Sequence, residues 1–144
     1  MISKDRVAVI IVNWNTYELT RSCILSLKNC QHNNLEIFLV DNNSNDNSYK
    51  KFKKEFKDLH FILNNKNAGF CKANNQAIKK ILLKNTYDFI MLLNSDTEVS
   101  PVFIKPLIVL FNLNKQIGAV QPLILNWIDK STIWKYEGVL NKFF

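Results

Sequence analysis

Short apolar runs alternate with segments of helical period along most of the chain, and this order limits the fold more than any other feature of the sequence. Val7 to Val12 is a continuous, mostly β-branched run, which is typical of a strand that is covered on both faces. A helix is predicted from Thr16 to Asn29, because apolar residues recur there at helical spacing. The same patterns predict strands at Leu35 to Val40, Leu59 to Leu63, Tyr87 to Leu93 and Gly118 to Leu125, and helices at Tyr49 to Phe56, Phe70 to Lys84 and Pro101 to about Leu113.

Strands that alternate with helices join through right-handed crossovers into a mainly parallel sheet with helices on both faces. We therefore predict an α/β fold of Rossmann-like type, in a single domain that spans residues 1–144. The helix at 49–56 is expected to be capped by Asp46 or Ser48. The residues of the helix at 70–84 that should face the sheet are Ala73, Ala77, Ile78 and Ile81.

The net charge of +7 is carried mainly by lysine, since Arg6 and Arg21 are the only arginines among 19 basic residues. Arginine is the residue that best reads bases and phosphates, so we expect no nucleic-acid partner. Five lysines fall within Lys50 to Lys57, where Phe52 and Phe56 are spaced as one buried stripe of a helix. This run is either an ordinary solvated helix face or a surface that attracts anionic lipid or another polyanion.

Three cysteines, Cys23, Cys30 and Cys71, form no CxxC pair, and their odd number argues against a disulfide framework. Cys30 and His32 lack a second pair of ligands at useful spacing, so we expect no zinc site. The start of the chain has no apolar signal segment, and the apolar stretches are too short to span a bilayer. We therefore expect a cytoplasmic protein, with any membrane contact peripheral and on the inner face.

Polar loops begin at Asn13, Asp41 and Asn94, each directly after a predicted parallel strand. The carboxyl ends of such strands form the ligand-binding crevice of open α/β sheets, so the three loops are expected to converge. Asp41 and Asp96 are expected to project into this crevice, where one carboxylate can accept from a nucleobase or ribose and another can hold a divalent ion on two phosphates. Taken alone, each loop is more typical of a turn in which short polar side chains bond their own backbone, and it is their joint placement that favours a ligand site. Only three glycines are present and no glycine-rich phosphate motif occurs, so a metal would have to hold the phosphates.

Four sequence blocks occur in a fixed order along this pattern. They are VAVIIVNWN (7–15), LVDNNSNDNS (39–48), NAGFCKANNQA (67–77) and LLNSDT (92–97). With these blocks the chain resembles family 2 glycosyltransferases of the GT-A fold, especially the bacterial rhamnosyltransferase-like members, from Val7 to about Gly138. The resemblance implies inverting transfer of a sugar from a UDP- or dTDP-sugar to a saccharide or lipid-linked acceptor, with Mg or Mn as cofactor.

The resemblance also implies a set of donor-binding residues. Asp41 and Asn42 would contact the base or ribose, and Asp96 would coordinate the metal on the diphosphate. Gly69 and Asn75 have alternative interpretations, as a residue of positive φ in a turn and as a solvated helix residue. Apart from Asp41, Asn42 and Asp96, the set has three groups: Val12, Asn13 and Asn15 border the base pocket, Asn67, Gly69 and Asn75 shape the floor beneath the nucleotide, and Asn94 lies beside the metal.

The chain departs from the family pattern at several positions. Asn42 stands where many members have a second acid, and Asn94-Ser95-Asp96 keeps only the second acid of a DxD motif, as the rhamnosyltransferase-like members commonly do. Asn74 and Ala77 replace a common arginine and glycine, which puts direct phosphate contact there in doubt.

No catalytic residue is assigned. In the family the general base lies in a segment after a glycine-rich acceptor region, and the sequence ends at Phe144 before any such stretch. Asp129 and Glu137 are the only acids after Glu98, and neither lies in a matching motif, so we expect loop or surface charges. These observations predict a donor-binding part that lacks the acceptor and base segment and does not turn over alone.

Two other functions remain open on the sequence. One is a non-catalytic nucleotide-binding or assembly module that needs a partner chain and self-associates through its C-terminal aromatic residues, Trp127, Trp134, Phe143 and Phe144. The other is an unrelated doubly wound nucleotide-binding protein, which would explain the order of elements but not the four blocks.

Overall fold

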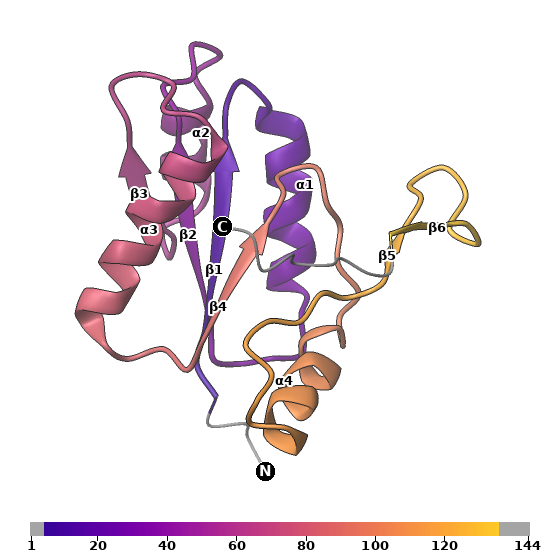
Figure 1. Cartoon of the computed structure of the whole chain (residues 1–144). Helices are drawn as coiled ribbons and strands as arrows, with labels where there is room; N and C mark the ends of the chain where they lie inside the picture. Colours follow the sequence, from indigo (N-terminus) through magenta and orange to yellow (C-terminus); the bar gives the residue numbers. More distant parts are fainter. Residues whose placement is uncertain (1–4, 136–144) are drawn as a thin grey trace, which may run out of the picture. The chain divides into compact units, whose positions relative to one another are not determined.

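The computed structural model describes residues 5–135, and the chain divides into two compact units at residues 101 and 102. The second unit holds a helix and a two-stranded sheet: α4 (Ile104–Leu113), β5 (Ile124–Leu125) and β6 (Ile133–Lys135). The first unit alternates strands and helices, as Figure 1 shows: β1 (Val7–Asn13), α1 (Tyr17–Lys28), β2 (Leu35–Asp41), α2 (Ser48–Glu55), β3 (His60–Leu63), α3 (Phe70–Lys84) and β4 (Phe89–Leu93).

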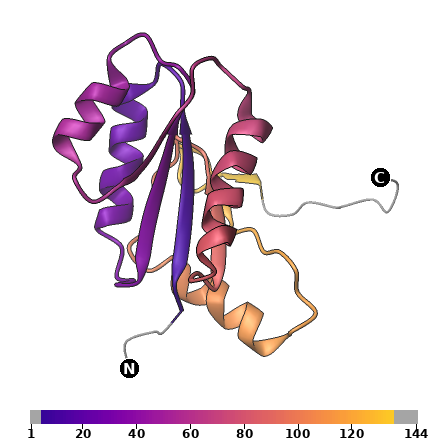
Figure 2. The same cartoon turned by 90° about the vertical axis from the view of Figure 1, so that its left-hand side faces the viewer.

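The sheet of the first unit has four parallel strands in the order β3-β2-β1-β4. Helices α1 and α2 cover one face and α3 covers the other, which is clearest when the sheet is viewed edge-on (Figure 2). The predicted α/β class, with a mainly parallel sheet between two helical layers, is confirmed. The central position of β1 explains its composition, because every residue from Val7 to Ile11 is buried.

The core on the α3 face joins the sheet to small residues of the helix. Ala73, Ala77 and Ile81 of α3 are buried in one cluster with residues of β1, β2 and β3, and Ile78 packs against it. The small side chains of Ala73 and Ala77 let the helix approach the sheet closely, and both face inward as predicted. On the opposite face α2 is anchored by Phe52, which is fully buried and packs against Tyr17 with ring centroids 4.8 Å apart.

The N-cap residue of α2 is Asn47, which is neither of the two expected caps, although Asp46 does bond the first helical amide. Asp46 Oδ1 accepts a hydrogen bond from the backbone amide of Ser48 at 2.9 Å, which satisfies a donor that has no partner inside the helix. Asn47 precedes the helix with a φ of 64°, a left-handed conformation that asparagine tolerates better than most residues. Ser48 itself is the first residue of the helix.

The prediction of a strand from Gly118 to Leu125 is wrong in its extent and its pairing. Only Ile124–Leu125 forms a strand, and it pairs antiparallel with Ile133–Lys135 in a separate sheet. Pro122 lacks an amide to donate within a ladder, and the apolar run that suggested a buried strand contains mostly exposed residues. Asp129 lies in the connecting turn, where its carboxylate accepts from the backbone amide of Ser131 at 3.0 Å, as expected of a loop charge.

The last helix begins later than its sequence suggests. Helix α4 starts at Ile104, three residues after Pro101, and it is Pro106 that occupies the first turn, where a missing amide costs nothing. No helix among residues 5–135 is long and apolar enough to cross a membrane. The predictions for Glu137, Gly138, Phe143 and Phe144 lie outside the described residues.

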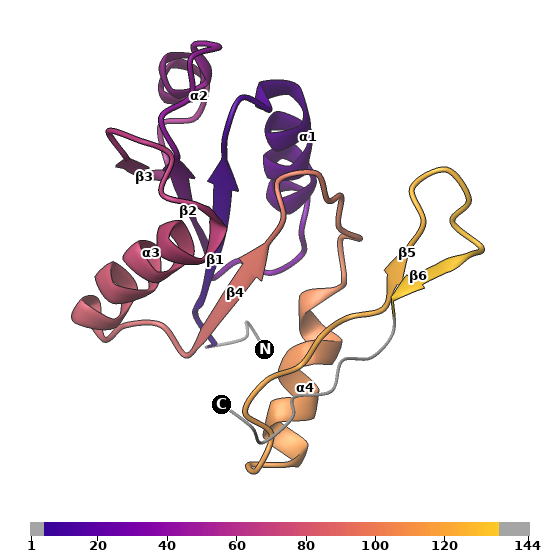
Figure 3. The ribbon, with the colours of Figure 1, turned by 45° about the horizontal axis from the view of Figure 1, so that its top comes forward.

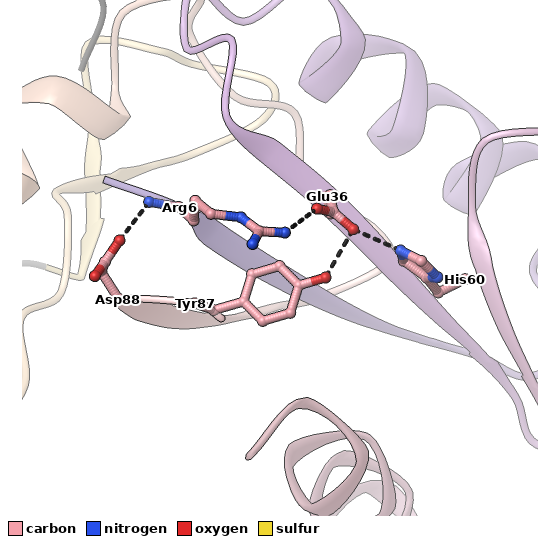
Figure 4. Close-up of polar contacts among 5 residues, drawn as sticks. All are labelled: Arg6, Glu36, His60, Tyr87 and Asp88. Atoms are coloured by element: carbon pink, nitrogen blue, oxygen red, sulfur yellow. Dashed lines mark hydrogen bonds and ion pairs between the residues drawn. The ribbon is translucent and has the colours of Figure 1, made fainter. Parts of the chain in front are cut away.

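A compact polar cluster closes the edge of the sheet where the strands begin (Figure 4). Glu36 accepts hydrogen bonds from Arg6 Nη2 at 2.8 Å, from His60 Nε2 at 2.7 Å and from the Tyr87 hydroxyl at 2.7 Å. Burial by itself raises the pKa of Glu36, but the hydrogen bonds from Tyr87, His60 and Arg6 outweigh it and lower the pKa to about 2. Burial and the bond to Glu36 raise the pKa of Tyr87 to about 12, so its hydroxyl remains a donor.

We predict that Glu36→Gln removes acid-sensitive stability. Because the folded pKa of Glu36 lies below its ordinary value of 4.5, its carboxylate stabilises the fold above that value and loses this effect as the pH falls toward 2. The variant should lose about 1 kcal/mol at pH 7, a modest figure because the pair with Arg6 is partly exposed. Urea unfolding between pH 2 and 7 measures this, with exposed Glu18→Gln as control. Parallel stability curves for wild type and Glu36→Gln would contradict it.

Candidate functional site

The strand register brings the predicted polar loops to one edge of the first unit. Asn13, the last residue of β1, lies opposite Asp41, the last residue of β2. Ile11 lies opposite Leu93, the last residue of β4, so the loop that begins at Asn94 starts beside the other two (Figure 3). The expected crevice position at the carboxyl ends of parallel strands is therefore where these residues lie.

Asn13 is fully buried and uses every hydrogen-bonding position of its side chain. Its Nδ2 donates to Asp41 Oδ2 at 2.8 Å and to Ser44 Oγ at 3.0 Å. Its Oδ1 accepts from Thr20 Oγ1 at 2.8 Å and from Thr16 Oγ1 at 3.1 Å. One amide thus joins the end of β1 to the first turns of α1 and to the loop after β2.

Asp41 is 1% exposed, and each of its carboxylate oxygens has a partner in the protein. Oδ1 accepts from the backbone amide of Ser44 at 2.9 Å, while Oδ2 accepts from Asn13. The Asp41 carbonyl accepts from the backbone amide of Asn64 at 2.9 Å, at the end of β3. A carboxylate has about four lone-pair positions, so each oxygen keeps room for one further donor.

Asn15 lies on the rim of the same edge. It has a φ of 56°, its backbone amide donates to Ser44 Oγ at 3.0 Å, and its Oδ1 accepts from the backbone amide of Asn45 at 2.8 Å. Val12 is half-buried and packs on the cluster beneath α3. A hollow of about 340 Å³ opens beside these loops and is lined by Asn15, Thr16, Tyr17, Glu18, Leu19, Asp46 and Lys51.

The loop from β3 to α3 carries the predicted floor residues. Asn67 and Gly69 are exposed, and Asn67 Oδ1 accepts from the backbone amide of Gly69 at 2.9 Å. Gly69 has a φ of +78°, and a side chain there would meet no atom within 4 Å, so its backbone conformation rather than crowding favours glycine. Asn75 is exposed on α3. Asn42 is buried and bonded to this loop.

Asn94 and Asp96 follow β4 and are both exposed. Their side chains make no hydrogen bond to any residue between 5 and 135, in contrast to those of Asn13 and Asp41. The Asn94 carbonyl accepts from the Cys23 thiol, with Sγ and oxygen 3.6 Å apart. Burial is the main cause that raises the pKa of Cys23 to about 12, and the negative charges of Asp96 and Glu98 add to it.

The exposed groups after β4 fit a divalent ion that arrives with a ligand. Within the described part of the chain no three His, Cys, Asp or Glu side chains are grouped as a metal site. Mg²⁺ is commonly held by one or two carboxylates together with substrate phosphates and water, and Asp96 provides one such carboxylate. The donor set therefore suits an ion that is bound mainly by phosphate oxygens.

Sequence reasoning missed several residues of this edge. Trp14 is 53% exposed directly after Asn13, although it lies within the first block. Ser44 bonds both Asn13 and Asn15, and its position three residues after Asp41 is the spacing of a side-chain-capped turn. Buried Thr20 was also missed, although it follows Thr16 by one helical turn.

Comparison with known structures supports the fold. S. aureus TarS (residues 1–349) in complex with UDP has a TM-score of 0.64 and 19% identity, covering 75% of this chain and 32% of that one. A complex of the same TarS fragment with UDP-GlcNAc has a TM-score of 0.62 and 19% identity, with 75% and 31% covered. The mannosyltransferase PcManGT from Pyrobaculum calidifontis, in complex with GDP-Man and Mn²⁺, has a TM-score of 0.61 and 18% identity, with 74% and 32% covered. The chain spans about a third of the length of these structures.

Comparison of the sequence gives the family. No curated protein matches the chain. The family model described as Glycosyl transferase family 2 matches residues 8–140. This range includes all four sequence blocks, apart from Val7, the first residue of the first block. Because this match covers most of the 144 residues, the chain belongs to glycosyl transferase family 2.

Proposed function

We propose that the protein takes part in inverting transfer of a sugar from a nucleotide-diphospho-sugar to a saccharide or lipid-linked acceptor, and that the described residues bind the donor. The observation that carries this proposal is the contrast within one sheet edge. Asn13 and Asp41 are buried in a hydrogen-bonded network, whereas the exposed side chains of Asn94 and Asp96 beside them make no hydrogen bond to any residue between 5 and 135. An edge is suited to a polar ligand when some of its polar side chains are fixed by hydrogen bonds within the protein and others are left to bond the ligand.

The nucleoside part of the donor is proposed to lie over β1 and β2. Val12, Asn13 and Asn15 border the base, and Asp41 accepts from the base or ribose through its remaining lone pairs. Trp14 offers an exposed indole face next to them, on which a base can stack. The complexes of TarS with UDP and with UDP-GlcNAc support a ligand of this class.

The diphosphate is proposed to lie over the loops after β3 and β4. Asp96 would coordinate Mg or Mn, which would neutralise the departing diphosphate, with Asn94 beside it. Asn67, Gly69 and Asn75 would form the floor. The Mn²⁺ in the GDP-Man complex of PcManGT supports a divalent ion.

The branch of the family and the domain organisation are also proposed. The single acid in Asn94-Ser95-Asp96 supports the rhamnosyltransferase-like branch. The family match across both compact units supports one donor-binding domain.

We predict that the chain binds UDP or dTDP in the presence of Mn²⁺ and that Asp96→Asn weakens this binding by at least about tenfold, because a metal ligand is lost. Isothermal titration calorimetry with and without EDTA measures the effect. Glu98→Gln is the matched control, since it removes a nearby exposed charge from the same loop. Absence of binding to UDP, dTDP and GDP under all conditions would reject the donor site and favour an assembly module.

Peripheral association with the inner face of a membrane is proposed for α2. Its buried stripe turns the lysines outward, and the neighbouring acids are already paired: Glu55 with Arg21 Nη2 at 2.7 Å, and Asp58 with Lys28. The surface is therefore strongly basic, and clusters of this size attract anionic lipid. Its exposed lysines are Lys50, Lys51, Lys53, Lys54 and Lys57.

We predict that Lys50→Gln/Lys54→Gln lowers binding to vesicles of phosphatidylcholine with 30% phosphatidylglycerol by about 30-fold, because each lysine near such a surface contributes about 1 kcal/mol. Sedimentation of vesicles at low and high salt measures the binding. Lys79→Gln/Lys80→Gln on α3 carries the same change of charge and should have a smaller effect. Equal losses for both pairs would show that only the net charge matters.

Self-association is proposed as a second property, and it is favoured by the exposed residues of the second unit. Trp127, in the turn between β5 and β6, is 60% exposed, and Trp134, in β6, is 73% exposed. Large exposed aromatics of this kind mark association surfaces.

We predict that Trp127→Ser/Trp134→Ser weakens self-association by about tenfold or more in sedimentation velocity, since buried aromatic residues commonly dominate protein interfaces. Leu83→Ser, at an exposed apolar position on α3, is the control. A wild-type chain that stays monomeric at all concentrations would reject this property without affecting the donor site.

A further inference from the structure

Asn42 connects the end of β2 to the loop that leads into α3. Its side chain is 2% exposed and makes four hydrogen bonds within the protein. Its Oδ1 accepts from Asn64 Nδ2 at 2.9 Å and from the backbone amide of Ala68 at 3.1 Å. Its Nδ2 donates to Asn67 Oδ1 at 2.9 Å and to the Gly69 carbonyl at 3.5 Å.

The orientation of these amides is determined by the backbone. The amide of Ala68 can only donate, so the atom of Asn42 that faces it must be the oxygen. The amide of Gly69 fixes the oxygen of Asn67 in the same way, because it donates to Asn67 Oδ1. Asn42 must therefore present its NH₂ group to Asn67.

Asn64 extends the network to α3. Its Nδ2 donates to Asn42 Oδ1 and, at 2.9 Å, to Gln76 Oε1, while its backbone amide donates to the Asp41 carbonyl. The loop at 64–69 is thus held at both ends and in its middle. Every hydrogen-bonding position of Asn42 is used in holding it, and none remains for a ligand.

We infer that Asn42 is a positioning residue, which holds the Asn67–Gly69 turn in place for the donor and does not itself contact the base or ribose. This inference rests on the proposed donor site and changes the role that the sequence suggests for Asn42. The exposed members of the turn, Asn67 and Gly69, are the ones that face outward. Asn42 sets nucleotide affinity through them.

The inference explains the type of residue at this position. An ionised aspartate has no donor, so Asn42→Asp would place a carboxylate oxygen against two acceptors, Asn67 Oδ1 and the Gly69 carbonyl. It would still accept from Asn64 and from the amide of Ala68. The variant therefore removes one half of the network and keeps the other.

Hydrogen exchange of the nucleotide-free 144-residue chain tests the contact. In Asn42→Ala the backbone amides of Ala68 and Gly69 should both exchange at least about fivefold faster, as expected for the loss of one hydrogen bond. In Asn42→Asp the backbone amide of Gly69 should exchange faster, while the backbone amide of Ala68 stays protected from exchange. Amides of Val9 and Ile10 should not change, which separates local loosening from lower global stability. Asn65→Ala is the matched control, since Asn65 is exposed on the same loop and makes no side-chain hydrogen bond to residues 5–135.

Calorimetric titration with UDP, dTDP and GDP in Mn²⁺ tests the role. If Asn42 is a positioning residue, Asn42→Ala should weaken the binding of all three nucleotides by a similar factor, about tenfold. The reason is that a less ordered turn must be organised on binding. A change in the ratio of affinities among the nucleotides would show direct base contact and overturn the inference, as would unchanged exchange at both amides. If the wild-type chain bound no nucleotide, the proposed function would fail and the inferred role with it, while the exchange data would still show whether Asn42 holds the turn.

Discussion

The buried hydrogen bond between Asn13 Nδ2 and Asp41 Oδ2, 2.8 Å long, lies where the two central strands end, and the geometry of the whole edge depends on it. It joins residues that are 28 positions apart in sequence and orients an amide whose oxygen accepts from Thr16, just before α1, and from Thr20 within it. A buried carboxyl group is costly unless it is hydrogen-bonded, so the backbone amide of Ser44 and the side chain of Asn13 are needed beside Asp41. The loops after β1 and β2 are consequently one structure rather than two independent turns.

The two edges of the sheet satisfy their polar groups by different chemistry. Where the strands begin, one carboxylate, that of Glu36, accepts hydrogen bonds from a guanidinium, an imidazole and a phenol. Where the strands end, asparagine side chains carry most of the contacts, and amides can both donate and accept within a short reach. The asparagines at 15, 43 and 47 also adopt positive φ, which few other residues tolerate. The abundance of asparagine is therefore structurally informative at these positions.

Much of the fold could be predicted from the sequence, because the strongest patterns reflect burial. The run at 7–12 is covered on both faces, and the helix at 70–84 has the predicted bounds because small and apolar residues mark one side of it. The segment at 118–125 was mispredicted since an apolar run does not reveal its pairing partner. The contacts of Asn42 could not be foreseen, because they depend on Asn67 and Ala68, which are about 25 residues away in sequence.

The burial of Cys23 beneath the loop after β4 has a chemical consequence. A thiol reacts as its thiolate, so a pKa of about 12 and the absence of solvent contact leave Cys23 inert while the fold is closed. Cys71 is exposed at the start of α3 and remains open to alkylation. Modification of Cys23 therefore requires the Asn94 carbonyl to move away from the thiol. The rate at which Cys23 is alkylated, relative to that of Cys71, reports how often the loop after β4 opens.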